Sequence, residues 1–211
     1  MSDAEPQSRS LGVGRLILLA LVIALLVKAF LFQVFFIPSG SMESTLLPGD
    51  RVIVQKVTYR FHDPGHGDVV VFRNPNARPV DRGAVDGFLH WLGTNLGMFG
   101  SAEGTCGDTN PDEDFVKRVI GLPGDTVQGK DGSVWLNGRR LAEPYLHGAR
   151  TSAFPTVNVP AGQLFVMGDN RSNSCDSRFA LGLVPIDNVI GPVLVRVWPA
   201  DRIGSLPSPD R

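Results

Sequence analysis

Three serines lie close together in a short segment that could supply a nucleophile. The segment reads IPSGSMESTL over residues 37–46, and its serines are Ser39, Ser41 and Ser44. Its proline and glycine favour a tight backbone turn, which would hold the hydroxyl groups in fixed positions. A serine hydroxyl is a weak nucleophile until a neighbouring base removes its proton, so a serine enzyme needs such a base elsewhere in the chain.

The four histidines of the chain are poorly placed to be that base. His62 and His66 flank a Pro-Gly pair, while His90 and His147 stand in isolated contexts. The i, i+4 spacing of His62 and His66 suits a metal site only on a helix, and Pro-Gly breaks such a helix. The pattern therefore favours histidines in a surface turn, and we expect no histidine-based triad, no metal and no cofactor.

Lys117 is an alternative base. It lies in DFVKRVI (residues 114–120), where alternation along a strand would put Phe115, Lys117 and Val119 on one face. A lysine can act as a base if burial lowers its pKa from about 10.4 towards neutrality. From the residues alone, an exposed lysine on an edge strand remains open.

A dense polar loop follows a predicted buried strand. It reads MGDNRSNSCDSR over residues 167–178. Loops that are held by rigid strands often carry function, although composition does not say which function.

Short, β-branched segments bounded by Gly, Pro or Asp predict a mainly β fold. We expect strands at 51–57, 68–72, 115–120, 164–167 and 189–198, and a hairpin of 134–136 with 139–141 around Asn137-Gly138. The sequence Leu-Pro-Gly-Asp occurs at 47–50 and at 122–125, and each copy predicts a type II turn that leads into a strand.

A long apolar run precedes the first serine segment. Residues 16–37 are interrupted only by Lys28 and Gln33, which predicts a transmembrane helix. A cleavable signal peptide is the competing interpretation, but the apolar run continues past Lys28 and no A-x-A site follows. Arg9 and Arg15 weakly favour a cytoplasmic N-terminus.

The charge balance of the chain argues against one class of function. The chain has 211 residues with 20 basic and 21 acidic side chains, and this balance argues against nucleic-acid binding.

A stripe of apolar residues at helical spacing (Val85, Phe88, Leu92, Leu96, Phe99) indicates either a helix packed on the sheet or an element at the membrane surface.

Four segments together resemble the bacterial type I signal peptidases, which are membrane-anchored Ser–Lys proteases. They are PSGSMESTLLPGD (38–50), HGDVVVF (66–72), FVKRVIGLPGD (115–125) and MGDNRSNSCDSR (167–178), and they follow an N-terminal anchor in the family's order. The resemblance implies an antiparallel β-sheet catalytic domain with a small β-hairpin lobe, behind one N-terminal transmembrane helix.

The resemblance also implies a role for each matching residue. Ser41 would be the nucleophile, Lys117 the general base, and Ser39 with the backbone N–H of Ser41 the oxyanion hole. Ser174 would orient the Lys117 amine. The supporting residues would be the ion pair Asp176 and Arg178, together with Asp169, Asn170 and Arg118.

One position and one short segment depart from the family's pattern, and the chain also contains two cysteines that could form a disulfide. Ser44 stands where proline is usual, which would loosen the turn, and residues 179–182 (Phe-Ala-Leu-Gly) replace an aromatic pair and glycine. Cys106 and Cys175 are the two cysteines of the chain. In an exported domain they suggest a disulfide, with two unrelated buried thiols as the alternative.

The expected organisation follows from these segments. It comprises a cytoplasmic tail (1–15), the anchor (16–37), an extracytoplasmic peptidase domain (38–203) and a flexible tail (204–211). Within the domain, 125–163 would form a smaller lobe and 74–112 a variable insertion. The implied partners are exported preproteins cut after small residues (A-x-A-like), the lipid bilayer of the plasma membrane and, by proximity, the secretion translocon.

Two other functions use some of the same features. A self-cleaving repressor of related Ser–Lys fold would need an N-terminal helix-turn-helix where this chain has an apolar run. An inactive anchored β domain that only binds partners would not need Ser41, Lys117 and Ser174 together.

Overall fold

The computed structural model describes residues 8–77, 86, 93 and 113–207. The chain begins there with a long helix, α1 (Ser8–Leu31), and continues mainly as strands. The strands are β1 (Phe32–Phe36), β2 (Arg51–Gln55), β3 (Val69–Arg73), β4 (Asp114–Gly121), β5 (Thr126–Lys130), β6 (Ser133–Leu136), β7 (Arg139–Arg140), β8 (Phe154–Asn158), β9 (Gln163–Met167), β10 (Val184–Pro185) and β11 (Val189–Trp198). Short 3-10 helices lie at Thr58–Arg60 (η1), Pro144–Leu146 (η2), Ile186–Asn188 (η3) and Ala200–Arg202 (η4).

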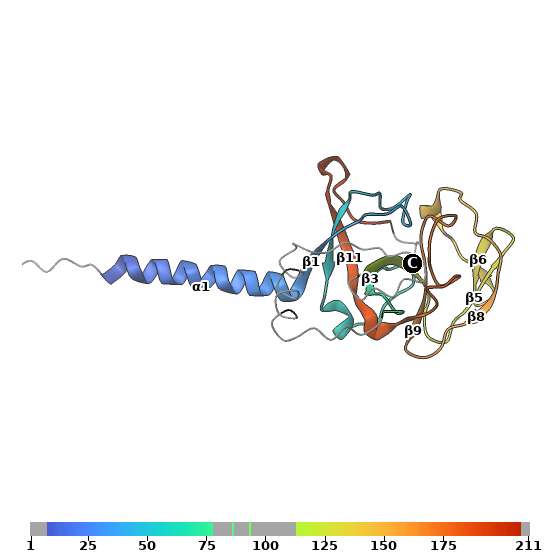
Figure 1. The fold of residues 1–211 in the computed structure, drawn as a ribbon, viewed down its shortest axis with the longest axis horizontal. Helices are drawn as coiled ribbons and strands as arrows, with labels where there is room; N and C mark the ends of the chain where they lie inside the picture. Colours follow the sequence, from blue (N-terminus) through green and yellow to red (C-terminus); the bar gives the residue numbers. More distant parts are fainter. Residues whose placement is uncertain (1–7, 78–85, 87–92, 94–112, 208–211) are drawn as a thin grey trace, which may run out of the picture.

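The strands form two antiparallel sheets. The larger has seven strands in the order β1-β2-β11-β3-β4-β9-β10, and the smaller has four in the order β7-β6-β5-β8. Figure 1 shows α1 projecting from the side of the molecule where β1 lies, with the smaller sheet at the opposite end. The mainly β antiparallel fold predicted from the sequence is confirmed.

Strand β4 lies inside the larger sheet, between β3 and β9. Phe115, Lys117 and Val119 are all buried on it, and Lys117 is 0% exposed. The interpretation of Lys117 as an exposed edge lysine is therefore wrong.

The two Leu-Pro-Gly-Asp turns and the Asn137-Gly138 turn form as predicted. Gly49 and Gly124 have φ values of 95° and 90°, as the third residue of a type II turn requires, and each turn leads into a strand. Asn137 and Gly138 also have positive φ and connect β6 to β7.

The apolar run at 16–37 does not form one helix. Helix α1 begins at Ser8 and ends at Leu31, and Phe32–Phe36 is a strand that pairs antiparallel with β2. The alternating burial of this strand, with Gln33 and Phe35 inside, explains the change, because the partner strand offers hydrogen bonds and a core to one face. The expectation that one helix continues to residue 37 is therefore wrong, while the tail (1–15) and the anchor (16–37) stay predictions.

Among the described residues, no helix combines the length and the apolar character that crossing a membrane requires.

Two predicted segments lie mostly outside the part of the chain that the structure describes, and a third, the start of the C-terminal tail, lies inside it. The apolar stripe from Val85 to Phe99 and most of the 74–112 insertion lie outside the described residues. Residues 204–207, predicted to begin a flexible tail, are held in the domain: the Gly204 and Arg196 backbones exchange two hydrogen bonds, and the carbonyl of Pro207 accepts one from Arg118.

Candidate active site

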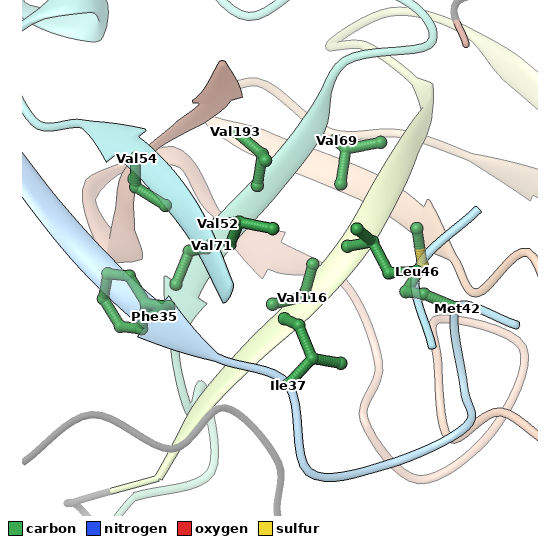
Figure 2. Close-up of a cluster of buried hydrophobic side chains, with 10 residues drawn as sticks. All are labelled: Phe35, Ile37, Met42, Leu46, Val52, Val54, Val69, Val71, Val116 and Val193. Carbon is green, nitrogen blue, oxygen red and sulfur yellow. The ribbon is translucent and has the colours of Figure 1, made fainter. Parts of the chain in front are cut away.

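Ser41 lies in a tight turn between β1 and β2. The carbonyl of Met42 accepts hydrogen bonds from the N–H groups of Thr45 and Leu46, at 3.0 and 2.8 Å. Met42 and Leu46 are buried in a cluster with Ile37 and Val116, as Figure 2 shows. The residues on both sides of Ser41 are thus anchored in the core, which fixes the position of its hydroxyl.

Lys117 reaches this hydroxyl from β4. Its Nζ donates a hydrogen bond to Ser41 Oγ at 2.7 Å, and Ser41 is itself 5% exposed. A buried amine at this distance from a buried hydroxyl is the geometry that a nucleophile and its general base require. Two residues that are distant in sequence are therefore in direct contact.

Ser39 lies beside the backbone of Ser41. The Ser41 N–H donates to Ser39 Oγ at 3.3 Å. These are the two groups expected to form the oxyanion hole, and they lie within hydrogen-bond distance of each other.

The 167–178 loop packs against the turn that carries Ser41. The Asn170 N–H donates to the Ser41 carbonyl, and Asn170 Nδ2 donates to the Gly40 carbonyl, both at 2.9 Å. A Cβ on Gly168 would lie 2.4 Å from the Ser41 carbonyl oxygen and 2.2 Å from Ser174 Oγ. Only glycine permits this approach of the loop to the turn.

Ser174 lies near the expected place but does not make the expected bond. Its Oγ is buried and has no hydrogen-bond partner among the described residues. The predicted hydrogen bond to Lys117 is therefore not formed, since the Lys117 amine is directed at Ser41 Oγ.

Arg118 and Asp169 form a buried ion pair next to Lys117. Arg118 Nε and Nη2 donate to the two carboxylate oxygens of Asp169 at 2.8 and 2.7 Å, and both side chains are 0% exposed. Thr45 Oγ1 donates to the same carboxylate. The pair thus connects strand β4, the 167–178 loop and the turn that carries Ser41.

Asp176 and Arg178 form a second buried pair within the loop. Arg178 Nε and Nη2 each donate to the Asp176 carboxylate at 2.8 Å. Asp176 also accepts from the Gly168 N–H, and Arg178 donates to the carbonyl of Arg171. These bonds hold the loop in the shape that presses Gly168 against Ser41.

Two residues that support the 167–178 loop, Glu143 and Tyr145, were not marked by any pattern in the sequence. Arg171 forms a buried ion pair with Glu143 and donates to the carbonyl of Gly168. Burial lowers the pKa of Arg171, but the hydrogen bond and charge of Glu143 outweigh this and raise it overall. Burial and the charge of Glu143 raise the pKa of Tyr145 above its usual range, so its hydroxyl stays protonated.

Of the two departures from the family pattern, Ser44 lies in the turn that carries Ser41. Ser44 has a φ of 87° and its Oγ donates to the carbonyl of Tyr145 at 2.9 Å, so this turn is tied rather than loose. A proline, with φ near −65°, does not fit this backbone. Phe179 is 52% exposed, and Gly182 has a φ of 69°.

Cys175, next to Ser174, is disulfide-bonded. Cys106, its predicted partner, lies outside the described residues, so the pairing stays a prediction.

The histidines within the described residues take no part in this site. His62 and His66 are exposed in the turn before β3, and His66 Nε2 contacts Asp125 at 2.6 Å. No group of three or more potential ligands that could hold a metal occurs in the part of the chain that the structure describes.

The chain is similar to known signal peptidases. A family model for signal peptidase, peptidase S26, matches residues 10–198. The probable signal peptidase I-1 of Synechocystis sp. is 42% identical over 193 residues, which are 92% of this chain and 85% of that protein. Signal peptidase I T of Bacillus subtilis is 34% identical over 188 residues, or 84% of this chain and 80% of that protein.

A solved signal peptidase I from Enterococcus faecalis is 28% identical, with a TM-score of 0.42 over 62% of this chain and 97% of that chain. The family match and the curated relatives favour a peptidase over the self-cleaving repressor and the binding-only domain. The chain belongs to the signal peptidase I family, the serine endopeptidases of family S26 that remove signal peptides from preproteins.

Proposed function

We propose that Ser41 and Lys117 carry out the cleavage as a nucleophile and its general base. The observation that supports this most directly is the 2.7 Å contact between Lys117 Nζ and Ser41 Oγ inside a buried site. Burial disfavours the charged form of a lysine, and the neutral amine is the form that can accept a proton.

The reaction would proceed through an acyl-enzyme. Neutral Lys117 takes the proton of Ser41 Oγ, and the oxygen attacks the scissile carbonyl to form a tetrahedral intermediate. Ser39 Oγ–H and the Ser41 N–H then donate to the oxyanion. The new amino terminus leaves with a proton from Lys117, and a water activated by the same amine releases the signal peptide from Ser41.

Ser174 completes the proposed arrangement. Its Oγ is buried and unpartnered among the described residues, and it lies against Gly168 next to the Ser41 carbonyl. A small rotation of the Lys117 amine, once Ser41 is acylated, would give this hydroxyl a partner. We infer that Ser174 holds the amine during the step in which water attacks.

We also propose that the N-terminal segment holds the domain at a lipid bilayer, with its N-terminus cytoplasmic and the peptidase domain outside. The exposed apolar residues of α1 support this: Val13, Leu16, Ile17, Leu18, Leu19, Leu21, Val22 and Ile23. Phe36 of β1 and Trp198 of β11 are also exposed large side chains. An anchor here would place Ser41 close to the membrane surface, where precursors emerge.

The substrates would be exported preproteins with small residues at positions −3 and −1. The test is cleavage of a purified preprotein by the full-length chain in lipid vesicles, with sequencing of the new amino terminus. We expect one cut after a small residue, at a rate that rises with pH as Lys117 loses its proton. Multiple cuts without this preference would contradict the proposed specificity, and a flat pH profile would contradict the lysine base.

A further inference from the structure

The carboxylate of Glu43 lies against the residue between the two proposed oxyanion donors. A Cβ on Gly40 would be 2.6 Å from Glu43 Oε1 and 2.8 Å from its Cδ, so the carboxylate rests beside the Gly40 α-carbon. The turn holds it there, because the Glu43 N–H donates to the Gly40 carbonyl at 3.1 Å. The neighbours of Gly40 are Ser39 and Ser41.

The 167–178 loop fixes the same carboxylate from its other side. Asn170 Nδ2 donates to Glu43 Oε2 at 2.9 Å and to the Gly40 carbonyl at the same distance. This amide is neutral, and Glu43 has no ion pair with any described residue. Glu43 is exposed. A negative charge without an ion-pair partner among the described residues therefore stands at the rim of the site.

The negative charge of Glu43 disfavours formation of the tetrahedral intermediate unless a positive charge lies nearby. The tetrahedral intermediate places a negative charge between Ser39 and Ser41, and the negative charge of Glu43 beside Gly40 repels it. A positive charge on the substrate next to the scissile bond would be attracted to Glu43 and would reduce the repulsion. A negative charge there would add to it.

We propose that Glu43 is a specificity-determining residue, which makes this peptidase favour precursors with a basic side chain beside the cleaved bond and disfavour acidic ones. This inference rests on the proposed function. In an extended peptide the side chains alternate, so if −1 and −3 enter the site as small residues, −2 and +1 point the other way. Those two positions can carry a long basic side chain to the rim.

The test uses one preprotein with Lys, Gln or Glu at +1, and a second set with the same changes at −2. Values of kcat/KM are measured for the full-length wild type, for Glu43→Gln and for Asp187→Asn. Asp187→Asn is the matched control, since it removes one exposed carboxylate from η3. Exposed charge pairs contribute up to about 1 kcal/mol, so each step from Glu to Gln to Lys should raise the wild-type value roughly two- to five-fold at low salt.

We expect this order to disappear in Glu43→Gln, to persist in Asp187→Asn and to weaken as salt is added to the wild type. Equal rates for the three substrates in the wild type, or an unchanged order in Glu43→Gln, would overturn the inference while leaving the proposed function intact. A wild type that cleaves none of the substrates would overturn the proposed function and this inference with it.

Discussion

The guanidinium of Arg118 lies 3.8 Å from the centre of the Tyr145 ring, and this contact joins the smaller lobe to the strand that carries Lys117. Tyr145 is 2% exposed. Its carbonyl accepts from Ser44 Oγ, and its hydroxyl donates to Glu143, which pairs with Arg171. Tyr145 thus touches the turn after Ser41 and the neighbour of Lys117 at once, so the segment around η2 supports both of the proposed reacting groups.

Replacing Tyr145 by leucine should therefore lower catalysis more than substrate binding. Without the ring, Arg118 loses its stacking contact, while the bond from Ser44 Oγ to the main-chain carbonyl at position 145 is kept. Arg118 is the neighbour of Lys117, and a misplacement of about 1 Å typically costs about 100-fold in rate. We expect kcat to fall about ten- to 100-fold with KM within about two-fold. Tyr145→Phe keeps the ring and should stay within about three-fold of the wild type. Equal losses in both variants would show that the hydroxyl matters and the ring contact does not.

The oxyanion role of Ser39 can be tested by removing its hydroxyl alone. Ser39→Ala should lower kcat by about 10²- to 10³-fold and leave KM nearly unchanged, because the donor acts on the intermediate more than on the bound substrate. Ser39→Thr retains the hydroxyl and should recover most of the activity. A Ser39→Ala variant with wild-type kcat would exclude Ser39 as a donor.

Gly168 should not tolerate even one added carbon. In Gly168→Ala the Cβ would collide with the Ser41 carbonyl and with Ser174 Oγ, so the loop must move away from the turn. We expect kcat/KM to fall by at least about 100-fold. Gly204→Ala is the control, since its Cβ would meet nothing within 4 Å. Comparable activity in both variants would mean that the loop does not position Ser41.

The smaller lobe should also show an acid-dependent stability. Burial raises the pKa of Asp125, but hydrogen bonds from Asn137, His66 and Leu122 outweigh it and lower the pKa below its usual 3.8. A lowered carboxyl pKa adds stability that is fully present above the unfolded value and is lost as the pH falls through the folded one.

Urea unfolding of the wild type and Asp125→Asn at several pH values measures this contribution. The wild type should have the higher midpoint at pH 6, and the gap should close as the pH falls below about 4. A gap that is constant down to pH 2 would show that Asp125 does not contribute through its charge.

Local patterns in the sequence predicted much of this structure, because they depend on near neighbours. Alternation placed Lys117 on the same face as Phe115 and Val119, but it left an exposed edge lysine open, and the position of β4 inside the sheet decided this. Glycine at the third turn position predicted both Leu-Pro-Gly-Asp turns. The change from helix to strand at Phe32 could not be predicted, because an apolar run suits a buried strand as well as a helix. Pairing with β2 decides between the two.

The supporting contacts of the site could not be predicted for a related reason. Tyr145 meets Arg118, and Glu143 meets Arg171, only after the two sheets have packed together. No spacing or composition near Tyr145 marks such a contact. Residues that act on other residues through the tertiary structure leave no local pattern.

The most direct measurement is kcat/KM for preprotein cleavage by the wild type, Ser41→Ala and Lys117→Ala, with Ser205→Ala and Lys130→Ala as matched controls on exposed residues. Since a nucleophile and its general base act as a unit, we expect each of the first two variants to lose at least about 10³-fold, and the controls to keep wild-type activity. Cleavage by Ser41→Ala or Lys117→Ala at the wild-type rate would contradict the Ser–Lys mechanism.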